Sequence, residues 1–235
     1  MRVFHGEDSS QAPQQEWAIK GILPKQQITI VQGKAGIGKT FLLLDWALCC
    51  ASDKPWVNHA TTHGHVVYVS AFGLNRLGPR LRAWVKYHQQ GRDVLQSIGF
   101  VDVNTSILDS ETTQRLMETL RASMDKPSVV ILDMYDDQQK TVLHAAQRIL
   151  DEFGSSVVMV SSEGYPSFQV VQLTPFTRSV RGEKSINGFT ATFPERTGSG
   201  RTKTISLWLQ QVPAQDDLDP TGDLTTSCIL SEMSS

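Results

Sequence analysis

Residues 33–40 read Gly-Lys-Ala-Gly-Ile-Gly-Lys-Thr, and this octapeptide constrains the fold more than any other stretch of the chain. It matches the pattern G-x-x-x-x-G-K-[ST], in which the backbone amides of a glycine-rich loop surround a phosphate group at the positive end of a helix. The pattern has this meaning only between a strand and a helix. Both are expected here, because a β-branched run at 27–33 precedes it and a long apolar run at 40–52 follows it. A phosphate-binding strand–loop–helix unit is therefore predicted.

The residue types in this loop indicate what each side chain does. Lys39 is expected to reach the β- and γ-phosphates of a bound nucleoside triphosphate, and Thr40 to ligate Mg²⁺. Asp133 ends an apolar strand predicted at 128–134 and is the expected second partner of the metal, directly or through water. The predicted cofactors are thus ATP and Mg²⁺. The predicted nucleotide-binding residues are Gly33, Lys34, Ala35, Gly36, Ile37, Gly38, Lys39, Thr40 and Phe41.

Strand and helix patterns alternate along most of the chain, which indicates an α/β fold. Continuous Val and Ile runs predict a parallel sheet covered on both faces by helices. Period-two patterns after Pro166 predict antiparallel strands at the C-terminal end of this sheet. The other predicted parallel strands are 64–71 and 156–162, the helices are 76–90, 110–124 and 139–154, and the antiparallel strands are 168–175, 187–195 and 201–212.

Length and composition predict one domain with two appendages. The 235 residues are 40% hydrophobic, enough for a single substantial core at 16–212. Residues 1–15 are polar and are expected to form a flexible arm. The segment 213–235 contains five acidic residues and no Lys or Arg, and is expected to be disordered or docked on a protein partner. The rest of the chain has 19 acidic residues, 24 minus those five, against 22 basic ones. This small positive balance is compatible with a nucleic-acid partner but does not argue for one.

Membrane, secreted and metal-cluster classes find no support in the sequence. The longest apolar run, 41–51, contains Asp45 and is too short for a bilayer. The start of the chain lacks the apolar core of a signal peptide. Of three cysteines, Cys49 and Cys50 are adjacent and Cys228 is alone, which fits no disulfide framework or metal-ligand spacing. A cytoplasmic protein without a membrane partner is expected.

The stretch from "WAIKGILPKQQITIVQGKAGIGKT" through "GHVVYVSAFG" resembles the RecA-like P-loop ATPases, in particular the plasmid RepA type of hexameric replicative helicase. Trp17–Pro24 matches the lead Trp-x-(I/V)-x-G-x-(L/I)-P of that family. The resemblance covers about residues 16–212. It implies a RecA-like core, a homo-oligomeric ring that is a hexamer in the RepA type, and action on single-stranded DNA.

The chain departs from this family at the residue that activates water. The relatives end one strand with Ala-Glu-Gly, whose glutamate polarises the attacking water, whereas this chain has Ala71-Phe72-Gly73. A phenyl ring cannot accept a proton, and loss of a general base typically costs about a hundred- to ten-thousandfold in rate. The sensor strand also differs, because it ends in Ser161-Ser162-Glu163 instead of a histidine pair or a glutamine. Three alternatives stay open: Glu163 activates water, Asp136 or Asp137 does so, or ATP is held with little turnover.

The resemblance also suggests residues that act between subunits or on DNA. Arg201 and Lys203 follow a glycine-bearing turn, as does the trans-acting basic pair of RecA-like hexameric helicases, so the catalytic candidates are Lys39, Glu163, Arg201 and Lys203. Tyr165 or Phe168 could stack on bases. The helix with Arg76, Arg80, Arg82 and Lys86 is read as a solvated basic face. The candidate contacts to single-stranded DNA are Lys140, Arg178, Arg181 and Lys184.

A motor or clamp on single-stranded DNA is the first functional prediction, and two other classes compete with it. A recombination or strand-annealing protein would form filaments or irregular oligomers on DNA without directional unwinding. A scaffold would bind ATP and assemble, with no turnover stimulated by DNA.

Overall fold

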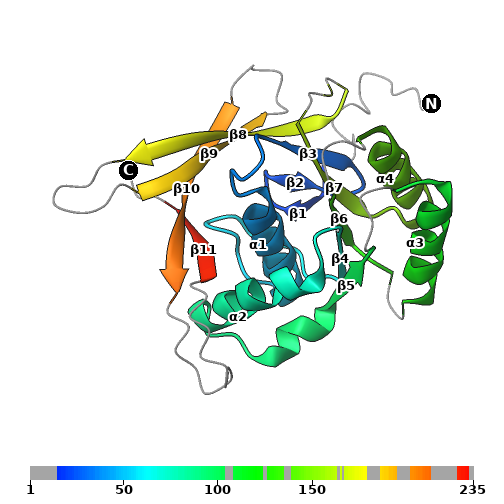
Figure 1. The fold of residues 1–235 in the computed structure, drawn as a ribbon, viewed down its shortest axis with the longest axis horizontal. Coiled ribbons are helices and arrows are strands. Elements are labelled where there is room, and N and C mark those ends of the chain that lie inside the picture. The colour runs from blue at the N-terminus through cyan, green and yellow to red at the C-terminus, as the bar shows by residue number, and fades with distance from the viewer. Residues whose placement is uncertain are drawn as a thin grey trace, which may run out of the picture.

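A computed structural model describes residues 15–103, 108–123, 126–134, 139–162, 165, 167–178, 186–194, 202–212 and 227–232. Its central feature is a nine-stranded sheet flanked by helices (Figure 1). The strand order is β11-β10-β9-β8-β3-β7-β6-β4-β5. The strands are β3 (Ile28–Gln32), β4 (Val66–Ser70), β5 (Ile98–Asp102), β6 (Val129–Asp133), β7 (Ser156–Ser161), β8 (Gln169–Arg178), β9 (Ile186–Pro194), β10 (Thr202–Val212) and β11 (Ser227–Glu232).

The sheet has a parallel part and an antiparallel part, as the sequence predicts. The pairs from β8 through β3, β7, β6 and β4 to β5 are all parallel. The pairs of β8 with β9, β9 with β10 and β10 with β11 are antiparallel. The α/β fold class with antiparallel C-terminal strands is therefore confirmed.

Helices cover both faces of the parallel strands. The helices are α1 (Lys39–Ser52), α2 (Gly78–Tyr87), α3 (Ser110–Ala122) and α4 (Gln139–Phe153). Successive strand residues point to opposite faces, so Tyr68 and Ile131 join a core with α1 and α2, while Val69 and Leu132 join a second core with α3 and α4. The short strands β1 (Trp17–Ile19) and β2 (Leu23–Pro24) add Ile19 to the first core.

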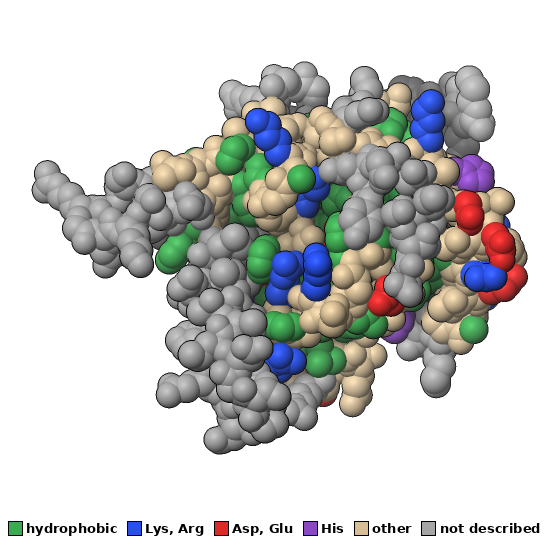
Figure 2. Space-filling view, in the orientation of Figure 1, with side chains coloured by type: hydrophobic (Ala, Val, Ile, Leu, Met, Phe, Trp, Pro, Cys, Tyr) green, Lys and Arg blue, Asp and Glu red, His purple; other side chains and the backbone are tan. Residues whose placement is uncertain are grey.

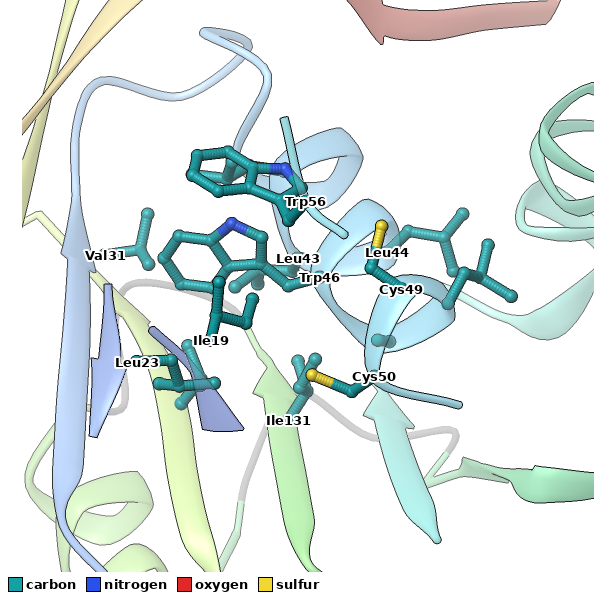
Figure 3. Close-up of a cluster of buried hydrophobic side chains, with 14 of the residues drawn as sticks. Ile19, Leu23, Val31, Leu43, Leu44, Trp46, Cys49, Cys50, Trp56 and Ile131 are labelled. Atoms are coloured by element: carbon teal, nitrogen blue, oxygen red, sulfur yellow. The ribbon is translucent and has the colours of Figure 1, made fainter. Parts of the chain in front are cut away.

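Helix α1 is the most deeply buried helix among the described residues. Every residue from Leu42 to Ala51 is buried, because the sheet, the β1–β2 pair and α2 surround it. Figure 3 shows Trp46, which belongs to α1, beside Trp56, and their rings meet edge to face with centroids 5.6 Å apart. Cys49 and Cys50 are free thiols on this helix. The apolar run at 41–51 thus lies at the centre of the first core.

The structure contains strands that the sequence did not predict. Strand β5 was missed, since Gly99 interrupts its apolar pattern, and so were the short strands β1 and β2. Helix α3 begins at Ser110, as predicted, and Asp109 caps it, because the Asp109 side chain accepts a hydrogen bond from the Thr112 amide. The expectation of a disordered segment at 213–235 is wrong for Ser227–Glu232, because these residues form β11 on the open edge of β10. Within the described residues, no helix combines the length and apolar character that a bilayer crossing requires.

Candidate nucleotide-binding site

The glycine-rich loop connects the end of β3 to the start of α1, as predicted. Gly36 and Gly38 have φ values of 78° and 113°, a region that side chains other than glycine rarely enter. A Cβ atom on Gly38 would also lie 2.8 Å from the ring of Phe189 on β9. The loop therefore requires glycine at Gly38 for two reasons, its backbone conformation and its contact with the neighbouring strand.

Lys39 is the first residue of α1 and its side chain folds back over the loop. Its ammonium group donates a hydrogen bond to the Gly33 carbonyl, at 2.6 Å. The amides of the first turn of a helix have no partner within that helix and attract anions. The positive charge of Lys39 and the positive end of the α1 dipole thus lie together at the glycine-rich loop, where both attract an anion.

Thr40 and Asp133 lie together although they are far apart in the sequence. Asp133 ends β6, is 2% exposed, and accepts hydrogen bonds from the Tyr68 hydroxyl, at 2.8 Å, and from Thr40. Burial raises the pKa of the Asp133 carboxyl, and the bonds from Tyr68 and Thr40 oppose this rise. A hydroxyl and a carboxylate next to each other are the oxygen ligands that Mg²⁺ takes in phosphate sites.

One pocket joins these groups. Its volume is about 820 Å³, which lies within the range of small-molecule sites. Gly33, Lys34 and Ile37 belong to the loop but do not line this pocket. The pocket is lined by Ala35, Gly36, Gly38, Lys39, Thr40, Phe41, Phe72, Arg76, Leu77, Arg80, Asp133, Met134 and Val160. A glycine cradle, a lysine and a hydroxyl–carboxylate pair in one pocket fit a magnesium–nucleotide complex.

Phe72 lies beside Asp133 at the edge of this pocket. Ser70, the last residue of β4, is in register with Asp133, and the Ala71 amide donates to the Asp133 carbonyl at 3.2 Å. The Phe72 amide donates to the Ser70 hydroxyl, which turns the chain directly after the strand. Phe72 thus follows the strand next to Asp133 and lines the pocket without a carboxylate of its own. Strand β7, which leads to Glu163, lies on the other side of β6.

Two arginines in the pocket were not assigned to it from the sequence. Arg76 and Arg80 line the pocket, and the guanidinium carbon of Arg80 lies 4.2 Å from the centroid of the Phe41 ring. The positive charge of Arg80 also acts on the Asp133 carboxylate. Figure 2 shows basic side chains gathered near the middle of this face. Arg80 of α2, which is partly buried, and Arg76, which is exposed in the turn before α2, thus line the pocket, a position that the reading of a solvated basic face did not include.

Of the remaining candidates, those that the structure describes do not line the pocket. Lys203 lies on β10, and its ammonium group is 2.5 Å from Nε2 of His59 in the same chain. Lys140 is exposed on α4, and Arg178 is the last residue of β8. The rings of Tyr165 and Phe168 meet edge to face, with centroids 6.3 Å apart. Outside the described residues lie Asp136, Asp137, Glu163, Arg181, Lys184 and Arg201.

Comparison with known proteins identifies a family and a fold for this chain. Residues 1–140 match the AAA domain family over the strand, loop and helix that form the cradle, and as far as Asp133. The chain belongs to the AAA domain family. No curated protein matches this AAA domain. Among solved structures it is similar to a KaiC-like protein from the hyperthermophilic archaeon Pyrococcus horikoshii OT3, with a TM-score of 0.50 and 13% identity over 86% of this chain and 90% of that one. This likeness shows that the AAA domain has a RecA-like fold.

Proposed function

We propose that this AAA domain binds Mg-ATP and works as a ring-forming RecA-like ATPase on single-stranded DNA, of the plasmid RepA helicase type, with weakened hydrolysis. One observation supports nucleotide binding above all others. Lys39, Thr40 and Asp133 line a single pocket at the start of α1. Lys39 and Arg80 would bind the phosphates, while Thr40 and Asp133 would hold Mg²⁺, whose charge polarises the γ-phosphoryl group.

The weak point of the pocket is activation of water. Among the described residues that line it, Asp133 is the only carboxylate, and this group already accepts bonds from Tyr68 and Thr40. Phe72 contributes no acceptor beside it. Slow hydrolysis follows unless Glu163, Asp136 or Asp137 supplies the missing base.

Three features support a ring on DNA. Lys203 sits on an antiparallel strand outside the pocket of its own chain, as a residue that completes the site of a neighbour would. The exposed Lys140 and the aromatic pair Tyr165 and Phe168 follow β6 and β7, strands whose carboxyl ends also carry the pocket. Basic and aromatic side chains together are typical of proteins that bind single strands.

ATP turnover with and without single-stranded DNA tests the proposal, using the native protein, Lys39→Ala, Phe72→Glu and Glu163→Gln. We expect slow native turnover, none above background for Lys39→Ala, and at least a tenfold gain for Phe72→Glu if the ring occupies the place of the base. Equal turnover of native protein and Lys39→Ala would refute the ATPase. Loss of activity in Glu163→Gln would assign the relocated base.

An ATP-dependent scaffold is the second candidate, and Phe72 is the observation that favours it. A pocket that binds ATP but lacks a base would use the nucleotide to fix the assembly. Both candidates assemble, so ATP turnover with and without single-stranded DNA distinguishes them: a scaffold shows no stimulation by DNA, while light scattering shows that it still assembles with Mg-ATP.

A further inference from the structure

Asp45 is a buried carboxylate in the middle of α1, and it does not line the nucleotide pocket. Its side chain is 8% exposed, in a helix whose neighbouring residues are apolar. Oδ1 accepts a hydrogen bond from Nε1 of Trp84 at 2.6 Å, and Oδ2 accepts one from Nε1 of Trp56 at 2.8 Å. Among the described residues Asp45 forms no salt bridge, and an unpaired carboxylate is costly in a core. Its two directed bonds therefore point to a role in placing the elements that donate them.

The residues that join α1 to α2 repeat with the same spacing on both helices. Phe41 and Asp45 are four residues apart on α1, and Arg80 and Trp84 are four residues apart on α2. Residues with this spacing lie one above the other on a helix face. The Arg80 guanidinium contacts the Phe41 ring, and one turn further on Trp84 donates to Asp45. The two helices are thus joined at two successive levels.

The two levels differ in their surroundings and in how strictly they fix position. Phe41 and Arg80 line the nucleotide pocket and are only partly buried. Trp84, by contrast, is 3% exposed, and its indole N–H can reach the carboxylate in few orientations. A shift of α2 by one residue would turn Trp84 away from α1 by about 100°. The buried level therefore specifies where α2 lies along α1.

We propose that Asp45 and Trp84 are positioning residues, which set the register of α2 on α1 and thereby hold the Arg80 guanidinium at the phosphates of Mg-ATP. The proposal rests on the nucleotide binding proposed above. It explains why a carboxylate stands in the most buried helix of the fold. It also assigns to Trp84 an effect on nucleotide affinity although this side chain touches no part of the pocket.

Trp84→Phe tests the proposal, with Trp56→Phe as its matched control. Each variant keeps an aromatic ring and removes one indole donor from Asp45, but only Trp84 belongs to the helix of Arg80. We expect Trp84→Phe to raise the dissociation constant for Mg-ATP about three- to tenfold and Trp56→Phe to raise it less than twofold. In an Arg80→Ala background, Trp84→Phe should have no further effect. An equal effect of both variants, or an effect that persists without Arg80, would overturn the proposal.

Hydrogen exchange of the nucleotide-free protein separates this proposal from the proposed function. If Trp84 sets the register, exchange of the amides of 78–87 rises in Trp84→Phe and changes little in Trp56→Phe. If exchange is unchanged in Trp84→Phe and the native protein binds ATP, the proposal that Trp84 sets the register of α2 is refuted, while the proposed nucleotide binding stands. Native protein that fails to bind Mg-ATP refutes the proposed function, and with it the ligand assigned to Arg80.

Discussion

Burial raises the pKa of the Asp45 carboxyl from its ordinary 3.8 to about 6, against the opposing effect of its two indole donors. The folded state thus prefers the protonated form more strongly than the unfolded state does. This contribution to stability is fully present below pH 3.8 and is lost as the pH rises through about 6. The loss amounts to about 3 kcal/mol, since one pKa unit corresponds to about 1.4 kcal/mol.

A comparison of native protein with Asp45→Asn measures this loss. Between pH 4 and pH 7, the free energy of unfolding of the native protein relative to Asp45→Asn should fall by up to about 3 kcal/mol, because only the native protein ionises at this site. Urea unfolding at several pH values gives the difference. Burial also lowers the pKa of His88 to about 4, which destabilises the fold as the pH falls, but both proteins share this effect. A difference that is constant with pH would contradict the prediction.

At the scale of elements, the glycine-rich loop depends on β9 as well as on the two elements it connects. Gly38 packs against the ring of Phe189, which reaches the loop from an antiparallel strand late in the chain. Gly36 has a similar backbone conformation and no atom near its missing Cβ. A side chain at Gly36 would therefore meet backbone strain alone, whereas a side chain at Gly38 would meet backbone strain and a clash with Phe189.

Substitution by alanine distinguishes these two contributions. Gly36→Ala should lower the free energy of unfolding by about 1–3 kcal/mol, the cost of a side chain in the left-handed region. Gly38→Ala should lower it further, because its Cβ would clash with Phe189. Thermal unfolding and Mg-ATP titration of both variants provide the test. Equal losses of stability would show that Phe189 moves aside freely.

The glycine-rich loop could be predicted from the sequence, because its pattern is contained in a few consecutive residues. The rest of the site depends on packing between elements that are distant in the sequence. The patterns of the strand and helix on either side of the loop predict the roles of Lys39 and Thr40. The end of an apolar strand predicts the role of Asp133. Arg80 could not be assigned to the pocket from the sequence, because only the packing of α2 against α1 brings it there. Strands β5 and β11 were missed for a related reason: both are short edge strands, each held in the sheet by a single neighbour.

At the scale of the whole molecule, β11 forms one edge of the sheet and covers the long strand β10. It pairs with β10 from Leu207 to Val212 and lies against α1 and α2. An open strand edge carries unpaired amides and carbonyls and favours association with other chains. β11 therefore pairs backbone groups of β10 that would otherwise be open to other chains.

Removal of residues 213–235 tests this role. The truncated protein should form larger assemblies than native protein at the same concentration, because it exposes six residues of β10 that are now paired. Light scattering measures the mass of both. Removal of only 233–235 keeps β11 and serves as the control. A truncated protein with the native mass would show that β10 is protected in another way.

The position of β3 in the sheet has a consequence for biosynthesis. Its neighbours are β7 and β8, so Ile28 pairs with Val157 and Thr29 with Gln169. A ribosome adds about 5–20 residues per second, so β3 remains without either partner for roughly ten seconds after it is made. The strand that leads into the phosphate loop is thus among the first segments synthesised, but it gains its pairing partners only after β7 and β8 have been made. A nascent chain that has not yet reached β7 should be unable to bind nucleotide.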